Sequence, residues 1–227
     1  MGTRTAATGA QAARPSPPGR PFRLGRWTAG TVLGESVGFL LPVTAFALAD
    51  AAGLAGWPAW LLLVAVGAGE GALLGAGQSL ALRGSAAAVP IGRWIAVTAA
   101  AASGAWAIGM LPSTLADAGT TVDWGAPATW VIAGIAGLVL LASIPLAQWP
   151  VLAGAGVPRA WRWVPIGMVA WLAGLPFTFA PSPMVGLSTP APVVFALFAA
   201  SGLCMAVVMA LVTGIGLRRM LRERTTT

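Results

Sequence analysis

The sequence predicts an all-α, polytopic membrane protein, a bundle of six transmembrane helices. First, 57% of the 227 residues are hydrophobic and 8% are charged, whereas soluble domains carry about 25% charged residues. Second, the chain contains six apolar runs that are long enough to span a bilayer, separated by short connections. Third, all 13 basic residues are arginines, and they gather at the ends of these runs, where basic residues set membrane topology.

Residues 1–25 are rich in Ala, Gly, Pro and Arg and show no apolar periodicity. We expect a disordered basic tail, which either touches anionic lipid headgroups or only helps to set topology. The first span follows over residues 27–49. A cleaved signal peptide is the alternative, because the Ala-Leu-Ala sequence at 47–49 resembles a small-residue cleavage site. The length of the run and the presence of Glu35 favour a retained span.

The other spans are expected over residues 58–82, 94–111, 129–151, 163–179 and 193–217. About 20 apolar residues in a helix cross a hydrocarbon core of about 30 Å. Because every connection is short, residues 26–220 are expected to form one transmembrane domain, and residues 221–227 a short C-terminal tail. The single cysteine, Cys204, excludes an intrachain disulfide.

Six spans place all the arginines on one side of the membrane and Asp50, Asp117 and Asp123 on the other. The positive-inside rule then predicts that both termini are cytoplasmic. Tryptophans near the span ends are expected in aromatic belts: Trp27, Trp94, Trp149, Trp161 and Trp163 at the inner boundary, and Trp57, Trp60, Trp124 and Trp130 at the outer one. Trp106 and Trp171 fall deeper and are expected to pack between helices.

An internal repeat is visible in two independent spacings. An arginine followed by a tryptophan opens the first, third and fifth spans, at intervals of 67 and 69 residues. In the returning spans a glycine stands 11 residues before a polar residue, and these pairs are Gly67 with Gln78, Gly137 with Gln148, and Gly202 with Thr213. We expect three parallel copies of a two-helix hairpin, which bury their small-residue faces only when packed together. Chance similarity is the alternative, because Ala, Gly and Leu dominate the chain.

Glycines recur every four residues in the first two spans, at Gly30, Gly34 and Gly38 and at Gly67, Gly71 and Gly75. Small residues allow the close backbone approach that drives helix association in lipid. We therefore expect the first two spans to pack against each other through these glycines. The alternative interpretation is that these glycines act as hinges or form a surface that a ligand can approach.

Two ionisable residues lie inside spans, Glu35 and Glu70, at depths that agree to within about one helical turn. Ionising a carboxyl there costs about 2.5–3.5 kcal/mol, and no arginine lies within a span to compensate it. One hypothesis is a site for a proton or cation, with polar lining from Gln78, Ser143 and Gln148. The other is that each carboxyl is neutral and bonds a neighbouring helix. Prolines within the spans predict either kinks or broken helices: Pro42, Pro145, Pro150, Pro165 and Pro176.

The composition argues against an enzyme and against several kinds of partner. With no histidine and one cysteine, the chain lacks the usual zinc, Cys–His and haem ligands, so we expect no metal and no cofactor. The arginines do not form a basic face, so nucleic acid is not an expected partner. The expected partners are the lipid bilayer and either further copies of the chain or another membrane subunit.

Gly75, Gln78, Leu82 and Arg83 form a Gly-x-x-Gln-x-x-x-Leu-Arg pattern, and an Arg-Trp pair opens the next span. This pattern resembles a loose class of small bacterial multi-spanning proteins. The resemblance covers residues 67–112 best and 137–175 more weakly, and Thr213 replaces the glutamine in the third copy. The use of Arg alone, with abundant Ala and Gly, resembles a high-GC actinobacterium. The class has no assigned activity, so the resemblance implies a bacterial plasma membrane and no reaction.

Two functions remain open from the sequence. The first is a membrane protein that binds or moves a proton, cation or small solute near Glu35 and Glu70. The second is a structural or accessory subunit whose glycine faces hold a partner helix.

Overall fold

The computed structural model describes residues 20–186 and 188–223, which form a helical bundle. Its long helices are α1 (Leu24–Ala51), α2 (Gly56–Leu82), α3 (Ile91–Gly109), α5 (Pro127–Gly154), α6 (Trp163–Phe179) and α7 (Ala191–Arg222). The shorter elements are α4 (Leu111–Asp117) and the 3₁₀ turns η1 (Ala160–Arg162) and η2 (Ser182–Met184). Six helical segments in this part of the chain are long and apolar enough to cross a membrane. The predicted all-α bundle of six spans is confirmed.

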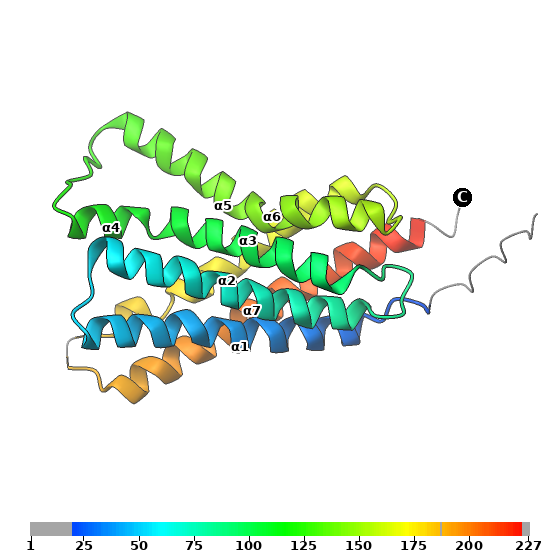
Figure 1. The fold of residues 1–227 in the computed structure, drawn as a ribbon, viewed down its shortest axis with the longest axis horizontal. Coiled ribbons are helices and arrows are strands. Elements are labelled where there is room, and N and C mark those ends of the chain that lie inside the picture. Colours follow the sequence, from blue (N-terminus) through cyan, green and yellow to red (C-terminus); the bar gives the residue numbers. More distant parts are fainter. Residues whose placement is uncertain (1–19, 187, 224–227) are drawn as a thin grey trace, which may run out of the picture.

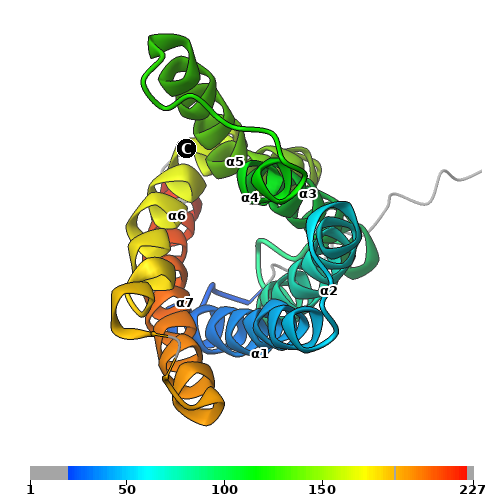
Figure 2. The same cartoon turned by 90° about the vertical axis from the view of Figure 1, so that its left-hand side faces the viewer.

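The six long helices form a ring. Neighbouring helices pack in the order α1, α2, α3, α5, α6 and α7, and α7 packs back against α1. Figure 1 shows the bundle from the side, and Figure 2 shows the ring along its axis. The hairpins α1–α2, α3–α5 and α6–α7 follow one another around this ring, each starting at the same end of the bundle.

The two ends of the bundle differ in charge. One end, here called the arginine face, carries the start of α1, the connections α2–α3 and α5–α6, and the end of α7. Every described arginine lies there. Glu223 joins the α5–α6 connection to the end of α7, because its carboxylate oxygens lie 2.9 Å from Arg159 and 2.6 Å from Arg162. The opposite end, the acidic face, carries Asp50, Asp117 and Asp123.

The α1 glycines face α2 across a close backbone contact. A Cβ atom placed on Gly30 would lie 2.5 Å from the carbonyl oxygen of Gly77, and one on Gly34 would lie 2.5 Å from that of Leu73. A Cβ on Gly38 would lie 3.0 Å from the carbonyl oxygen of Glu70. Only glycine therefore permits the observed separation of α1 and α2 along this face.

The predicted packing of the first two spans against each other is confirmed, but the row of Gly67, Gly71 and Gly75 on α2 faces α3 and not α1. A Cβ on Gly71 would lie 2.5 Å from the side chain of Ala102 on α3, and one on Gly75 would lie 3.0 Å from the Cα of Ile95. A Cβ on Gly67 would overlap the ring of Trp106, also on α3. The two rows thus serve two different contacts, α1–α2 and α2–α3. Gly69 and Gly77, outside the predicted row, are α2 glycines that meet α1.

The bundle is tight towards the arginine face and loose towards the acidic face. In α5, no residue before Ile144 is buried, and in α7 none before Ser201 is buried. In Figure 1 these two helix halves diverge from the other helices. Their outward side chains are apolar, as expected for surfaces in contact with lipid.

Two further expectations are revised by the structure. Residues 20–23 were included in the expected tail, yet Arg20 exchanges backbone hydrogen bonds with Gly84 and Ala86, and α1 begins at Leu24. Residues 1–19 and 224–227 lie outside the described part of the chain. The prolines leave every described span unbroken, so broken helices are not observed there.

Candidate functional site

Glu35 lies in the interior of the ring with no exposed surface. It shares one face of α1 with Thr31, Gly38 and Pro42, and all four residues are buried. Among the described residues, neither carboxyl oxygen of Glu35 has a hydrogen-bond partner, and the hydroxyl of Thr31 has none either. Burying a polar group without a hydrogen-bond partner costs free energy of folding. Glu35 and Thr31 are therefore candidates for a functional role.

Glu70 lies on α2 and is 8% exposed. Its Oε2 atom accepts a hydrogen bond from the indole Nε1–H of Trp106 on α3. Trp106 can approach Glu70 because Gly67, one turn earlier on α2, has no side chain in its way. The expected role as a bond between helices therefore describes Glu70, whereas Glu35 makes no such bond.

Glu35 and Glu70 lie on the two helices that form the α1–α2 contact. A Cβ atom on Gly38 would lie 3.3 Å from the Cγ of Glu70, and Gly38 is three residues after Glu35 on the same helix face. We call Glu35, Glu70 and Thr31 the carboxyl layer.

Gln78 and Gln148 do not line the carboxyl layer, contrary to expectation. Gln78 is eight residues beyond Glu70 on α2, about 12 Å nearer the arginine face. There the Nε2 group of Gln148 donates to the Oε1 of Gln78 at 2.9 Å and to the Oγ1 of Thr98 at 2.9 Å. Both glutamines are almost fully buried. They form a separate amide layer.

The amide layer is closed by three tryptophans that follow the internal repeat. The indole of Trp94 donates to Gln78 at 3.1 Å, that of Trp163 donates to Gln148 at 2.9 Å, and that of Trp27 donates to Thr213 at 3.1 Å. Each tryptophan opens one hairpin and bonds the polar residue that ends the preceding hairpin. The third bond joins α1 to α7 and closes the cycle.

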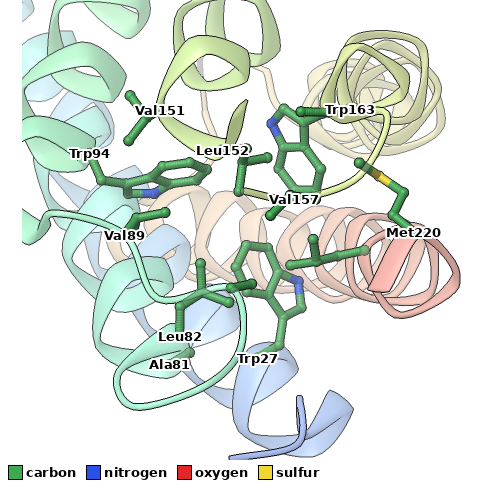
Figure 3. Close-up of a cluster of buried hydrophobic side chains, with 13 residues drawn as sticks. Trp27, Ala81, Leu82, Val89, Trp94, Val151, Leu152, Val157, Trp163 and Met220 are labelled. Carbon is green, nitrogen blue, oxygen red and sulfur yellow. The ribbon is translucent and has the colours of Figure 1, made fainter. Parts of the chain in front are cut away.

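Figure 3 shows these tryptophans with the leucines packed beside them. The ring centroids of Trp27 and Trp163 are 5.9 Å apart, and those of Trp94 and Trp163 are 6.3 Å apart. Leu82, Leu152 and Leu217, one turn closer to the arginine face, have no exposed surface. These contacts make the amide layer a packed seal between the carboxyl layer and the arginine face.

Ser143 belongs to neither layer. It is half-buried, and its hydroxyl donates to the carbonyl of Leu140 on its own helix at 2.8 Å. A cavity of about 10 Å³ lies beside the amide layer and is lined in part by Gln78, Gln148 and Thr213. It has room for about one water molecule.

The sequence misplaced three tryptophans of the amide layer and missed one hydrogen bond of a fourth tryptophan. Trp27, Trp94 and Trp163 were expected at the lipid headgroups, but at most 1% of their surface is exposed. The repetition of a tryptophan at the start of every hairpin was the sequence feature that could have indicated a buried, shared role. Trp106 was expected to pack between helices, and nothing in the sequence indicated its bond to Glu70.

Comparisons with family models, with curated proteins and with solved structures find no match for this chain. The resemblance over residues 67–112 and 137–175 stays a prediction.

Proposed function

We propose that this chain is a multi-pass protein of a bacterial plasma membrane, with both termini in the cytoplasm, that binds and moves a proton or a small cation at Glu35 and Glu70. The observation that carries the proposal is the fully buried carboxyl of Glu35, whose two oxygens have no hydrogen-bond partner among the described residues. A carboxyl that served only to join helices would have a partner on another helix, as Glu70 has in Trp106.

The charge balance of the interior supports this proposal. Every described arginine lies at the arginine face, so no side-chain cation compensates the two carboxyls within the spans. A pair of neighbouring carboxyls in hydrocarbon needs protons or bound cations to reach neutrality. Such a pair exchanges charge with any proton or cation that can enter, which is the basic requirement for a carrier.

The alternative, a subunit that holds a partner helix through its glycine faces, has less support. The row of Gly30, Gly34 and Gly38 faces α2, and the row of Gly67, Gly71 and Gly75 faces α3, so both rows are used within the chain. Further copies or another subunit would have to bind elsewhere on the lipid-facing surface.

The test is flux through the purified protein in sealed liposomes. A pH-sensitive dye reports proton movement under an imposed membrane potential, with Na⁺, K⁺ or Li⁺ supplied in turn. We expect flux from the wild-type protein and its loss in Glu35→Gln and Glu70→Gln. Asp50→Asn is the matched control, because Asp50 is an exposed acid on the same helix as Glu35.

Wild-type liposomes that carry no proton or cation current under any of these conditions would contradict the proposal. Flux that survives the double variant Glu35→Gln, Glu70→Gln would also contradict it, because the current would then pass through another route.

A further inference from the structure

We infer that the carboxyl layer is reached from the acidic face, and that Trp106 is the lid side chain that moves to admit the proton or cation. This inference rests on the proposed function, because it names the route to the same site. It is carried by the unequal closure of the bundle on the two sides of Glu35 and Glu70.

The route from the arginine face is closed by a complete layer. Trp27, Trp94 and Trp163 are buried, Trp163 packs against the other two, and each is hydrogen-bonded to a different hairpin. Opening this side requires several bonds between the three hairpins to break together. Side chains in dense, fully bonded packing of this kind exchange slowly.

The route from the acidic face is closed by fewer contacts. Trp106 is half-buried, lies one turn before the end of α3, and its indole hydrogen bond goes to Glu70 itself. Its ring meets Phe46 at a centroid distance of 6.3 Å, and Phe46 is 44% exposed. Rotation of one side chain would therefore break the bond to Glu70 and uncover the carboxyl.

The surrounding helices also favour opening at the acidic face. The halves of α5 and α7 on this side contain no buried residue and diverge from the ring (Figure 2). Segments with few buried contacts open at lower cost than the packed core. One side chain of α1 still contacts α7 near the site. Phe39, one turn beyond Glu35 towards the acidic face, packs where Gly202 on α7 has no side chain.

The experiment measures from which side a membrane-impermeant, cationic methanethiosulfonate reagent reaches a cysteine below the site. Thr31→Cys supplies the reporter in a Cys204→Ser background, since Thr31 is buried and lies on α1 between Trp27 and Glu35. Labelling rates are compared in sealed vesicles of known orientation. Ser36→Cys, directly next to Glu35 on α1, is the second reporter, used where Thr31→Cys does not fold.

With Trp106→Ala, we expect the labelling rate from the acidic face to rise about tenfold, the scale of one lost hydrogen bond to a charged group. Trp106→Phe, which keeps the ring without the N–H donor, should give a smaller increase. Gly67→Ala should act like Trp106→Ala, because its Cβ would displace the Trp106 ring. Trp163→Ala is the matched control and should raise labelling from the arginine face alone.

Equal rates in wild type and Trp106→Ala from the acidic face would overturn the inference, and so would faster labelling from the arginine face. Labelling does not depend on ion flux, so the two proposals can fail separately. If the Trp106 variants change labelling from the acidic face as expected but the protein carries no flux, only the carrier function is refuted. Flux in a protein labelled from the arginine face refutes only the route.

Discussion

Replacing Gln148 with leucine tests whether the amide layer holds the three hairpins together. Gln148 is 1% exposed and makes three hydrogen bonds of 2.9 Å, which reach Gln78 on α2, Thr98 on α3 and Trp163 on α6. Leucine fills a similar volume without any polar atom. The substitution therefore removes the bonds while it leaves the packing of the layer largely intact.

The expected loss follows from the number of bonds. Hydrogen bonds between transmembrane helices contribute about 0.6 kcal/mol on average and at most about 1.7 kcal/mol, so three bonds contribute about 2 kcal/mol. The indole N–H of Trp163 also loses its acceptor, which adds about 1 kcal/mol. We expect Gln148→Leu to lower the free energy of unfolding by about 3 kcal/mol.

The assay is reversible unfolding in mixed micelles of increasing SDS content, followed by circular dichroism. A double-mutant cycle of Gln148→Leu with Trp163→Phe should give a coupling energy of about 0.6–1.7 kcal/mol. Ser143→Ala is the control on the same helix, because the Ser143 hydroxyl bonds only its own helix backbone in the structure. The described bonding would be wrong if Gln148→Leu cost no more than Ser143→Ala, or if the coupling energy were zero.

Three further predictions can be checked in the same unfolding assay. Gly34→Ala should destabilise the protein by about 1–3 kcal/mol, because the new Cβ would meet the α2 backbone. The control Gly134→Ala, whose Cβ would have no neighbouring atom, should be neutral or stabilising by up to about 1 kcal/mol. Equal effects of the two substitutions would contradict the α1–α2 contact. The free energy of unfolding of the wild-type protein should fall as pH rises, because ionising a buried carboxyl is costly. Glu35→Gln should weaken this pH dependence. An identical pH profile in the variant would contradict the assignment of the dependence to Glu35. Glu223→Gln should cost at most about 1 kcal/mol, because its ion pairs are exposed, and a larger loss would indicate a stronger structural role.

The positions of the spans could be predicted because they depend on local properties of the chain. Predicted span ends differ from the helix ends by at most five residues, since apolar length and flanking charge decide where a helix crosses a bilayer. The hairpin repeat was also readable from the spacing of its tryptophans and polar residues. The buried face of α1 followed from the three- and four-residue spacing of Thr31, Glu35 and Gly38.

The candidate site was only partly predictable. Glu35 and Glu70 were identified because a carboxyl in a span is rare and costly. Their grouping with Gln78 and Gln148 was wrong, because depth along a helix places residues only approximately. The glutamines lie about 12 Å closer to the arginine face, where they bond tryptophans in place of carboxyls.

The sequence by itself determined six spans, their charge asymmetry, their repeat and the two intramembrane carboxyls. The tertiary structure decided which helix each face meets. A helical pattern defines a direction relative to its own axis, but the neighbour in that direction depends on how the hairpins close into a ring. For this reason the Gly67, Gly71 and Gly75 row faces α3 and not α1. For the same reason Trp27 lies next to Thr213, 186 residues away, and Trp106 lies over Glu70.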